Sequence, residues 1–253
     1  MIERKNKEIL RIMAEGGKIL AHVMSEVQAN AREGVTLEQL DRLANRLITQ
    51  AVATPAFLGY RPGGAARPYP ATICASVNDV VVHGVPTKYA IKKGDLVKLD
   101  FGLFYKKWCV DAAVTVAVPP ATSEAEHLVK VTREALAQGI EAMQAGNRLG
   151  DIGYAIERHV KQNGLTVVRG LTGHGIGKRL HEEPPVLNTG RRGRGEALLT
   201  GVTLALEPMI TTGSGDIIQR EDEGYATADG ALSAHFEHTV AVTENGPVIL
   251  TVL

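Results

Sequence analysis

The sequence has few aromatic residues, few cysteines and no excess of either charge. Aromatic residues make up 4% of the 253 residues, which disfavours a platform that stacks nucleic-acid bases. Lys and Arg together number 28, as do Asp and Glu, so the formal net charge is zero. Neither a specific nucleic-acid binder nor a membrane-surface binder is expected, because both need local positive charge.

Disulfides and membrane segments are not expected either. Cys74 and Cys109 are the two cysteines of the sequence, too few for a disulfide framework. The N-terminus is charged and lacks the apolar stretch of a signal peptide. No run of about 18 apolar residues would form a membrane-spanning helix. These features predict a cytoplasmic protein with free thiols.

What is present is typical of a folded globular chain, with 44% hydrophobic and 22% charged residues. Apolar residues spaced three and four apart predict helices, and runs rich in Val and Ile predict strands. The expected helices cover 3–31, a stretch beginning at Thr36, 123–145 and 149–162; the expected strands cover 72–77, 80–85, 95–104, 109–118 and parts of 165–253; residues 54–70 form a loop. Capping-box spacing at Thr36–Gln39 and Ser123–Glu126 supports two of the helix starts.

The two halves of the chain repeat one order, two helices followed by strands. Each half has a glycine six residues before a carboxylate, and a second carboxylate just before a strand of Val, Thr and Ala. Short strands of this composition can also resemble one another by chance. A true duplication predicts a single domain over 1–253, with halves of about 1–120 and 121–253, and a pseudo-two-fold axis near the four carboxylates Asp100, Asp111, Glu207 and Glu237.

Asp100 and Asp111 are equally distant from a hairpin turn placed between Tyr105 and Lys106. Such a turn would put the two carboxylates directly opposite each other, with Cβ atoms about 4.5–5.5 Å apart. They would repel unless protons or cations lay between them, and two metal ions about 3.5–4 Å apart would fit. The alternative is a pair of solvated aspartates, which their apolar strand neighbours disfavour.

Glu207 and Glu237 also lie in apolar runs, where an unpaired carboxylate is costly to bury. Either one alone would more often form a salt bridge, but the four acids together favour a metal site. Three histidines have unusual surroundings: His83 lies at a strand end, His174 among glycines and His181 before Glu-Glu-Pro. His22, His127 and His159 fall on expected helices and are interpreted as ordinary residues. A nucleotide-binding loop around His174 is rejected, because no Lys-Ser/Thr follows the glycines.

Five motifs occur together along the chain: the Asp100–Asp111 pair, His174-Gly-Ile-Gly177, His181-Glu-Glu-Pro184, Leu206-Glu-Pro-Met209 and Phe236-Glu-His-Thr239. Taken together they resemble methionine aminopeptidase of type I, over essentially the whole chain. The resemblance implies the pita-bread fold, an α+β fold whose antiparallel sheet carries two helix pairs on its outer face. It also implies metal-dependent removal of the N-terminal methionine from nascent proteins and peptides, preferentially when the second residue is small.

The resemblance assigns roles to ten residues. The metal ligands would be Asp100, Asp111, His174, Glu207 and Glu237, with Asp111 and Glu237 bridging two ions. Glu207 would also be the general base for the attacking water. His181 would hydrogen-bond the scissile carbonyl oxygen, and His83 would contact the scissile amide nitrogen. The methionine pocket would include Tyr60, Tyr69 and Cys74; simple loop anchoring is the alternative for the tyrosines, and a small buried apolar residue for Cys74.

Departures from the family pattern affect the rim and the surroundings of the ligands. The segment 61–68 is longer than in compact bacterial relatives, and His235 stands where a glutamine is common. His235 lies two residues before Glu237 on the same strand face, so it could contact metal or substrate. Phe57, Leu180, Tyr225 and the Ala-Ala after Asp111 are further differences.

The donor set is compatible with two divalent ions of Co, Mn, Fe or Zn. The implied partners are nascent polypeptides, with transient ribosome association, and a monomer is expected. Two other functions stay open: an Xaa-Pro-type pita-bread aminopeptidase, and a non-catalytic pita-bread protein that binds partners. The basic loop Arg191–Arg194 is interpreted as a solvated rim rather than a binding arm.

Overall fold

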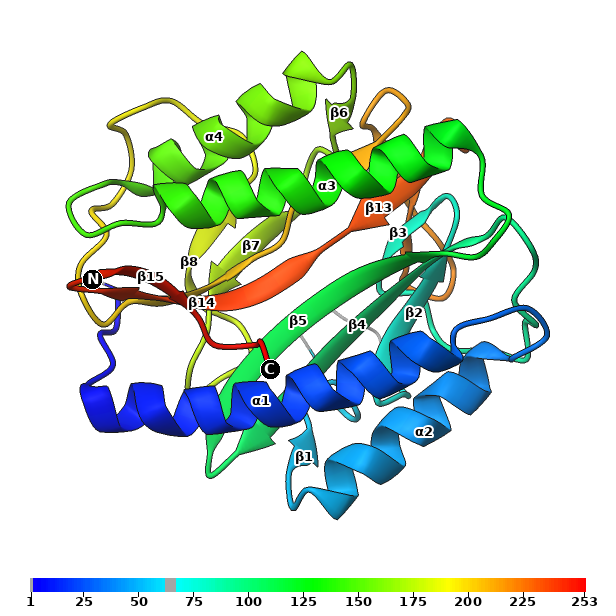
Figure 1. The fold of residues 1–253 in the computed structure, drawn as a ribbon, viewed down its shortest axis with the longest axis horizontal. Helices are drawn as coiled ribbons and strands as arrows, with labels where there is room; N and C mark the ends of the chain where they lie inside the picture. The colour runs from blue at the N-terminus through cyan, green and yellow to red at the C-terminus, as the bar shows by residue number, and fades with distance from the viewer. Residues whose placement is uncertain (1, 62–66) are drawn as a thin grey trace.

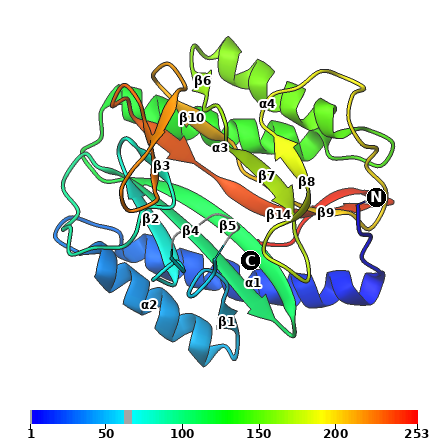
Figure 2. The same ribbon diagram turned by 180° about the vertical axis from the view of Figure 1, so that it is seen from behind.

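The computed structural model describes residues 2–61 and 67–253. A curved antiparallel sheet forms one layer, and helices cover one face of it (Figure 1). Turning the molecule brings the strands to the front and the helices behind them (Figure 2). The helices are α1 (Lys7–Asn30), α2 (Leu37–Gln50), α3 (Ser123–Ala142) and α4 (Leu149–Gln162). This is the pita-bread arrangement that the sequence predicts.

The main sheet of the described residues has nine strands in the order β1-β4-β5-β14-β9-β7-β8, with β2 paired to β4 and β15 to β14. Two three-stranded sheets, β13-β10-β6 and β11-β12-β3, complete the fold. The bounds are β1 Thr54–Pro55, β2 Ile73–Val77, β3 Val80–Val82, β4 Leu96–Tyr105, β5 Trp108–Ala117, β6 Thr166–Val167, β7 Thr172–Gly175, β8 Glu182–Leu187, β9 Thr203–Leu206, β10 Met209–Thr211, β11 Ile217–Gln219, β12 Tyr225–Thr227, β13 Ser233–His235, β14 Glu237–Thr243 and β15 Gly246–Ile249.

The helix boundaries follow local capping chemistry. The capping box at Thr36 is present, since its hydroxyl accepts from the Gln39 amide and the Gln39 side chain accepts from the Thr36 amide. The box predicted at Ser123 is wrong. Thr122 is the N-cap, its hydroxyl accepts from the Ala125 amide, and alanine at that position has no side-chain acceptor to complete a box. α1 and α3 are shorter than expected, whereas α4 has the predicted bounds.

The packing of α1 identifies the two faces of the sheet. Gly16 of α1 lies against the side chains of Leu103, Tyr105 and Val110, so these residues face the helices. Because side chains alternate along a strand, the intervening positions of β4 and β5 face the opposite, helix-free side. Asp111 is one of these positions, next to Val110. The predicted ligands on these strands therefore point away from the helix layer.

The hairpin β4–β5 has a different register from the predicted one. Its turn residues are Lys106 and Lys107, closed by a Tyr105–Trp108 pair, so Asp111 lies opposite Gly102 instead of Asp100. Both lysines have positive φ, 46° and 72°, the geometry of the tight turn that matches strand twist. The pairing shifts by two residues, which keeps both aspartates on one face.

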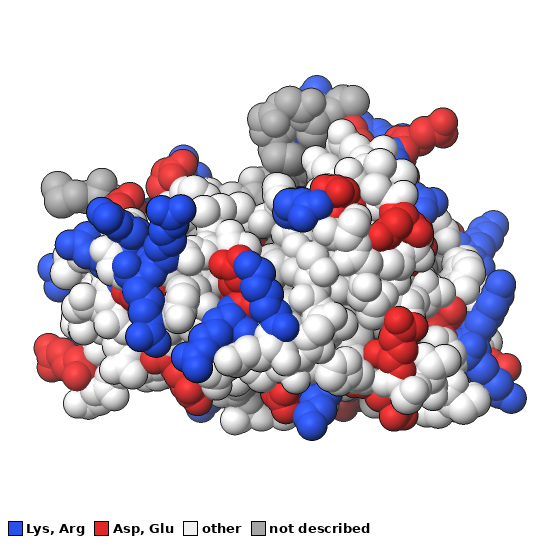
Figure 3. Space-filling model, turned by 90° about the horizontal axis from the view of Figure 1, so that it is seen from above, with Lys and Arg blue, Asp and Glu red and all other residues white. Residues whose placement is uncertain are grey.

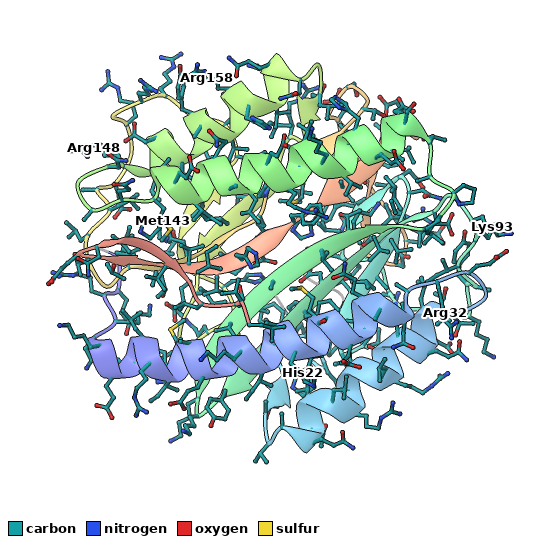
Figure 4. All side chains as sticks on the ribbon, in the orientation of Figure 1. His22, Arg32, Lys93, Met143, Arg148 and Arg158 are labelled. Carbon is teal, nitrogen blue, oxygen red and sulfur yellow. The ribbon has the colours of Figure 1, made fainter. Side chains whose placement is uncertain are left out.

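The surface of the helix layer is mixed in charge. Figure 3 shows acidic and basic side chains interspersed on the side where α3 and α4 lie, with basic residues gathered at one end. The Arg191–Arg194 loop is exposed, and the neighbouring Arg148 (labelled in Figure 4) donates a hydrogen bond to the Gly195 carbonyl. Within the described ranges, no helix combines the length and apolar character that crossing a membrane requires.

Candidate metal centre

Strand register brings two of the predicted ligands into one row of the sheet. Cys74 of β2 pairs with Asp100 of β4, Asp100 pairs with Ala113 of β5, and Ala113 pairs with Glu237 of β14. Residues in one row share a face, so Asp100 and Glu237 point to the same side. The methyl group of Ala113 between them leaves room for a ligand.

A second row lies two residues along the strands and supplies two more ligands. Asp111 lies opposite Gly102, and His174 of β7 lies opposite Ala205 of β9, which pairs with Thr239 of β14. Small residues again separate the polar side chains. The two rows together bring carboxylates and an imidazole to one face of the sheet.

Glu207 completes the cluster from the end of β9. Its Oε1 lies 3.5 Å from His174 Nε2, and the same nitrogen lies 3.9 Å from Asp111 Oδ2. Its other oxygen, Oε2, lies 3.4 Å from His235 Nε2. The structure thus brings all five residues with predicted ligand roles to one place, and it adds His235 to them.

Buried polar atoms in this cluster have no hydrogen-bond partner among the described residues. They are Asp100 Oδ1, Asp111 Oδ1, Glu237 Oε1 and His235 Nε2. Buried polar atoms are nearly always paired, and an unpaired buried charge is costly. Two sets of ligand atoms, from Asp111, His174 and Glu237 and from Glu207, His235 and Glu237, lie within 4.8 Å of one another. The donor set therefore fits divalent cations.

The acids of the cluster resist ionisation when no cation is near. Burial raises the pKa of Asp100 to about 7 and that of Glu207 to about 8. Burial, followed by the neighbouring carboxylates, raises the pKa of Asp111 and Glu237 well above the usual range. A bound cation would favour the ionised forms, which are the forms that coordinate metal.

The tautomer of His174 suits a metal ligand. Its Nδ1–H donates to the Gly175 carbonyl over 2.9 Å, so Nε2 carries the lone pair that faces the carboxylates. Burial, followed by the neighbouring His181, lowers the pKa of His174 to about 3, so the ring is neutral near pH 7.

Two further histidines with predicted roles, His181 and His83, lie near the cluster. The ring of His181 meets the ring of His174 edge-on at a centroid distance of 4.4 Å, and its Nδ1 lies 2.7 Å from the Tyr60 hydroxyl. His83 has a left-handed backbone, with φ of 61°, and its ring packs edge-on against Tyr225 at 5.8 Å. Both histidines are exposed, as groups that meet a substrate must be.

The expected methionine pocket is described in part. The Tyr69 hydroxyl donates to the carbonyls of Ile73 and Gly84, which agrees with the loop-anchoring alternative for this residue. Cys74 is 5% exposed and shares a row with Asp100, so its thiol borders the cluster. Of the segment 61–68, residues 62–66 lie outside the described residues.

The three helix histidines lie apart from the cluster. His22 is exposed on α1 in the helix layer (Figure 4). His127 bonds the Asn163 carbonyl, and His159 lies 3.2 Å from a Glu134 carboxylate oxygen. None of them approaches the predicted ligands.

Sequence reasoning missed two threonines that support the ligands. The Asp111 amide donates to the Thr239 hydroxyl, which donates back to the Asp111 carbonyl, both over 2.8 Å. Thr115 forms the same pair of bonds with the backbone of His235. Each threonine lies on the ligand face of its strand, and this alternation was the available signal.

Comparison with known proteins agrees with this geometry. The model of metallopeptidase family M24 matches residues 11–244. A methionine aminopeptidase of Clostridium perfringens is 43% identical over 100% of both chains, and methionine aminopeptidase 1 of Mycobacterium tuberculosis is 41% identical over 99% of this chain and 95% of that protein.

Solved structures resemble the chain over its whole length. A methionine aminopeptidase structure from Thermotoga maritima superposes with a TM-score of 0.95 at 39% identity, covering 100% of both chains. An Xaa-Pro dipeptidase from Bacillus anthracis gives a TM-score of 0.78 at 22% identity, covering 98% of this chain and 61% of that one, a likeness of fold alone. The chain belongs to metallopeptidase family M24, among its methionine aminopeptidases.

Proposed function

We propose that this chain is a metal-dependent aminopeptidase that removes the N-terminal methionine from peptides and nascent proteins. Its relatives support the reaction. One observation carries the metal dependence: three buried carboxylate oxygens and a buried imidazole nitrogen converge without a hydrogen-bond partner in the described part of the chain. A preference for a small second residue is part of the proposal.

Five residues would hold two divalent ions. Asp111 and Glu237 would contribute to both ions, Asp100 would help to hold one of them, and His174 with Glu207 would help to hold the other. The mixture of carboxylates and imidazole suits Mn, Fe, Co or Zn. When bound, the ions would polarise the scissile carbonyl and make the attacking water more acidic.

The remaining chemistry belongs to side chains of this chain. Glu207 takes the proton of the attacking water and passes it toward the leaving amine. If the Tyr60 hydroxyl donates to His181 Nδ1, the proton of His181 lies on Nε2, which can then donate to the carbonyl oxygen of the substrate. His83 contacts the scissile amide nitrogen.

The side chain of the substrate methionine would lie against Tyr60, Tyr69 and Cys74. A thioether packs well against aromatic edges, and the buried thiol adds an apolar wall. Burial raises the pKa of Cys74 well above its usual range, so the thiol stays neutral.

We also propose that residues 1–253 act as one catalytic domain whose halves meet at the metal centre. The pairing of Ala113 with Glu237 across β5 and β14, which joins the two halves, supports this organisation. A monomer suffices, because every proposed ligand comes from a single chain. Action on nascent chains would bring the enzyme into transient contact with ribosomes in the cytoplasm, where the buried free thiols of Cys74 and Cys109 stay reduced.

A panel of Met-X peptides beside Xaa-Pro peptides, assayed after metal removal and re-addition, tests the function. We expect cleavage of Met-Ala-Ser that is lost with chelator and returns with metal. Cleavage confined to Xaa-Pro bonds would favour the dipeptidase alternative. A chain that binds no divalent ion and cleaves nothing would favour the binding-protein alternative.

Glu207→Gln tests the general base. The variant should still bind metal but lose about 10²–10⁴-fold in kcat, because the amide cannot accept the proton of the water. Glu244→Gln is the matched control, since Glu244 is exposed in the turn between β14 and β15. Full activity of Glu207→Gln would refute its assigned role.

A further inference from the structure

His235 is a buried imidazole that the five-ligand centre leaves unused. It ends β13, is 1% exposed and pairs with Met209 of β10. Its Nε2 has no hydrogen-bond partner among the described residues. A buried imidazole nitrogen without a hydrogen-bond partner is a ready metal ligand.

The position of this nitrogen suits coordination better than hydrogen bonding. Nε2 lies 3.4 Å from Glu207 Oε2, yet the two atoms are not aligned as a hydrogen bond. Two ligand atoms that each lie about 2.1 Å from one ion can themselves be about 3.4 Å apart. Glu237 supplies a third ligand atom within 4.8 Å of the other two.

The backbone of His235 is held in the same way as that of Asp111. The His235 amide donates to the Thr115 hydroxyl over 2.9 Å, and this hydroxyl donates to the His235 carbonyl over 2.7 Å. Thr239 makes the equivalent bonds to Asp111. These two contacts flank the Ala113–Glu237 pair symmetrically, two residues to either side.

The Nε2 atom of His235 points into the same cluster as the proposed ligands. It groups with ligand atoms of Glu207 and Glu237, as Asp111 and His174 group with Glu237. The Thr115 hydroxyl anchors the backbone of His235 with the same two hydrogen bonds by which the Thr239 hydroxyl anchors that of Asp111.

We propose that His235 is a sixth protein ligand of the metal centre. Its Nε2, with Glu207 and Glu237, binds a divalent cation, so that the centre contains two imidazoles, from His174 and His235. Imidazole favours Zn, Co and Fe over Mn, whereas carboxylates suit Mn. His235 therefore shifts the metal preference of this chain toward the softer ions. The inference rests on the metal centre of the proposed function.

X-ray absorption at the zinc edge counts the imidazoles directly. Apoprotein loaded with two equivalents of Zn should show on average about one imidazole per ion, falling to about half in His235→Gln. His238→Gln is the matched control. His238 is three residues away on the helix-facing side, where its Nδ1 lies 2.9 Å from the Thr251 hydroxyl, and its replacement should leave the count unchanged.

Calorimetric titration of the same apoproteins separates a ligand from a merely structural residue. His235→Gln should lower the affinity for Zn or Co, the ions that imidazole favours, by about tenfold or more at one of the two sites, and should lower the affinity for Mn much less. His235→Glu should restore the affinity of the weakened site, with its preference moved toward Mn. Equal weakening of Zn and Mn would indicate a structural role and overturn the proposal.

The outcomes also distinguish this inference from the proposed function. Wild-type protein that binds no divalent ion would refute both. Wild-type protein that binds two ions with about half an imidazole per ion, unchanged in His235→Gln, would refute the sixth ligand alone. Folding of each variant is checked by circular dichroism in chelator before titration.

Discussion

The hydroxyl of Thr239 holds β14 against β5, so Thr239→Val should destabilise the protein strongly. Thr239 is fully buried, and its hydroxyl is the hydrogen-bond partner of both the amide and the carbonyl of Asp111. Valine has nearly the same shape, so the substitution leaves no cavity. It does leave two buried backbone groups unpaired, each costing about 1–3 kcal/mol, so the free energy of unfolding should fall by about 2–6 kcal/mol.

Urea unfolding of the metal-free protein, followed by circular dichroism, measures this loss without any contribution from metal binding. Thr243→Val on the same strand is the control. Thr243 donates to the Gly246 carbonyl over 2.7 Å, but it is half-buried at a turn, where water can replace the hydroxyl. The control should lose less than about 1 kcal/mol. A loss of this small size for Thr239→Val would refute the reasoning, provided that the m-values agree.

Three further predictions concern pH, packing and catalysis. The folded-state pKa values of Asp100 and Glu207 are raised to about 7 and about 8, so the metal-free protein should lose stability as the pH rises from about 4 to about 8. Added Mn²⁺ should stabilise the protein most at the upper end of this range. A melting temperature that does not change with pH would contradict the prediction. Gly102→Ala should cost about 1–3 kcal/mol in urea unfolding, because the new Cβ would lie 2.7 Å from Phe57 Cε1; unchanged stability would show that the ring moves freely. His181→Ala should lower kcat about 10²–10³-fold with metal content unchanged, as measured by peptide assay and elemental analysis; loss of bound metal instead would show that His181 supports the centre.

The sequence predicted the type and identity of the clustered residues better than their pairing. A turn at Tyr105–Lys106 was expected, but the chain turns at Lys106–Lys107. Tight turns with two positive φ angles usually contain Asn or Gly, and two lysines give no such signal. The prediction that Asp100 and Asp111 share a face of the sheet is nevertheless correct, because the register differs by two residues and side chains alternate with a period of two.

The hydrogen bonds that hold the backbones of the site residues could not be predicted from the sequence, because they depend on how strands from distant parts of the chain pair. Asp111 and Thr239 are 128 positions apart, and their contact follows from the Ala113–Glu237 pairing. The same pairing brings His235 into the cluster through Thr115. Local patterns identify an alternating strand and an acid that is costly to bury. Only the register between strands decides which of these side chains share a face and a row of the sheet. The contacts that the sequence does not predict, those of Thr239 and Thr115, are therefore the ones formed where the two halves of the chain pair.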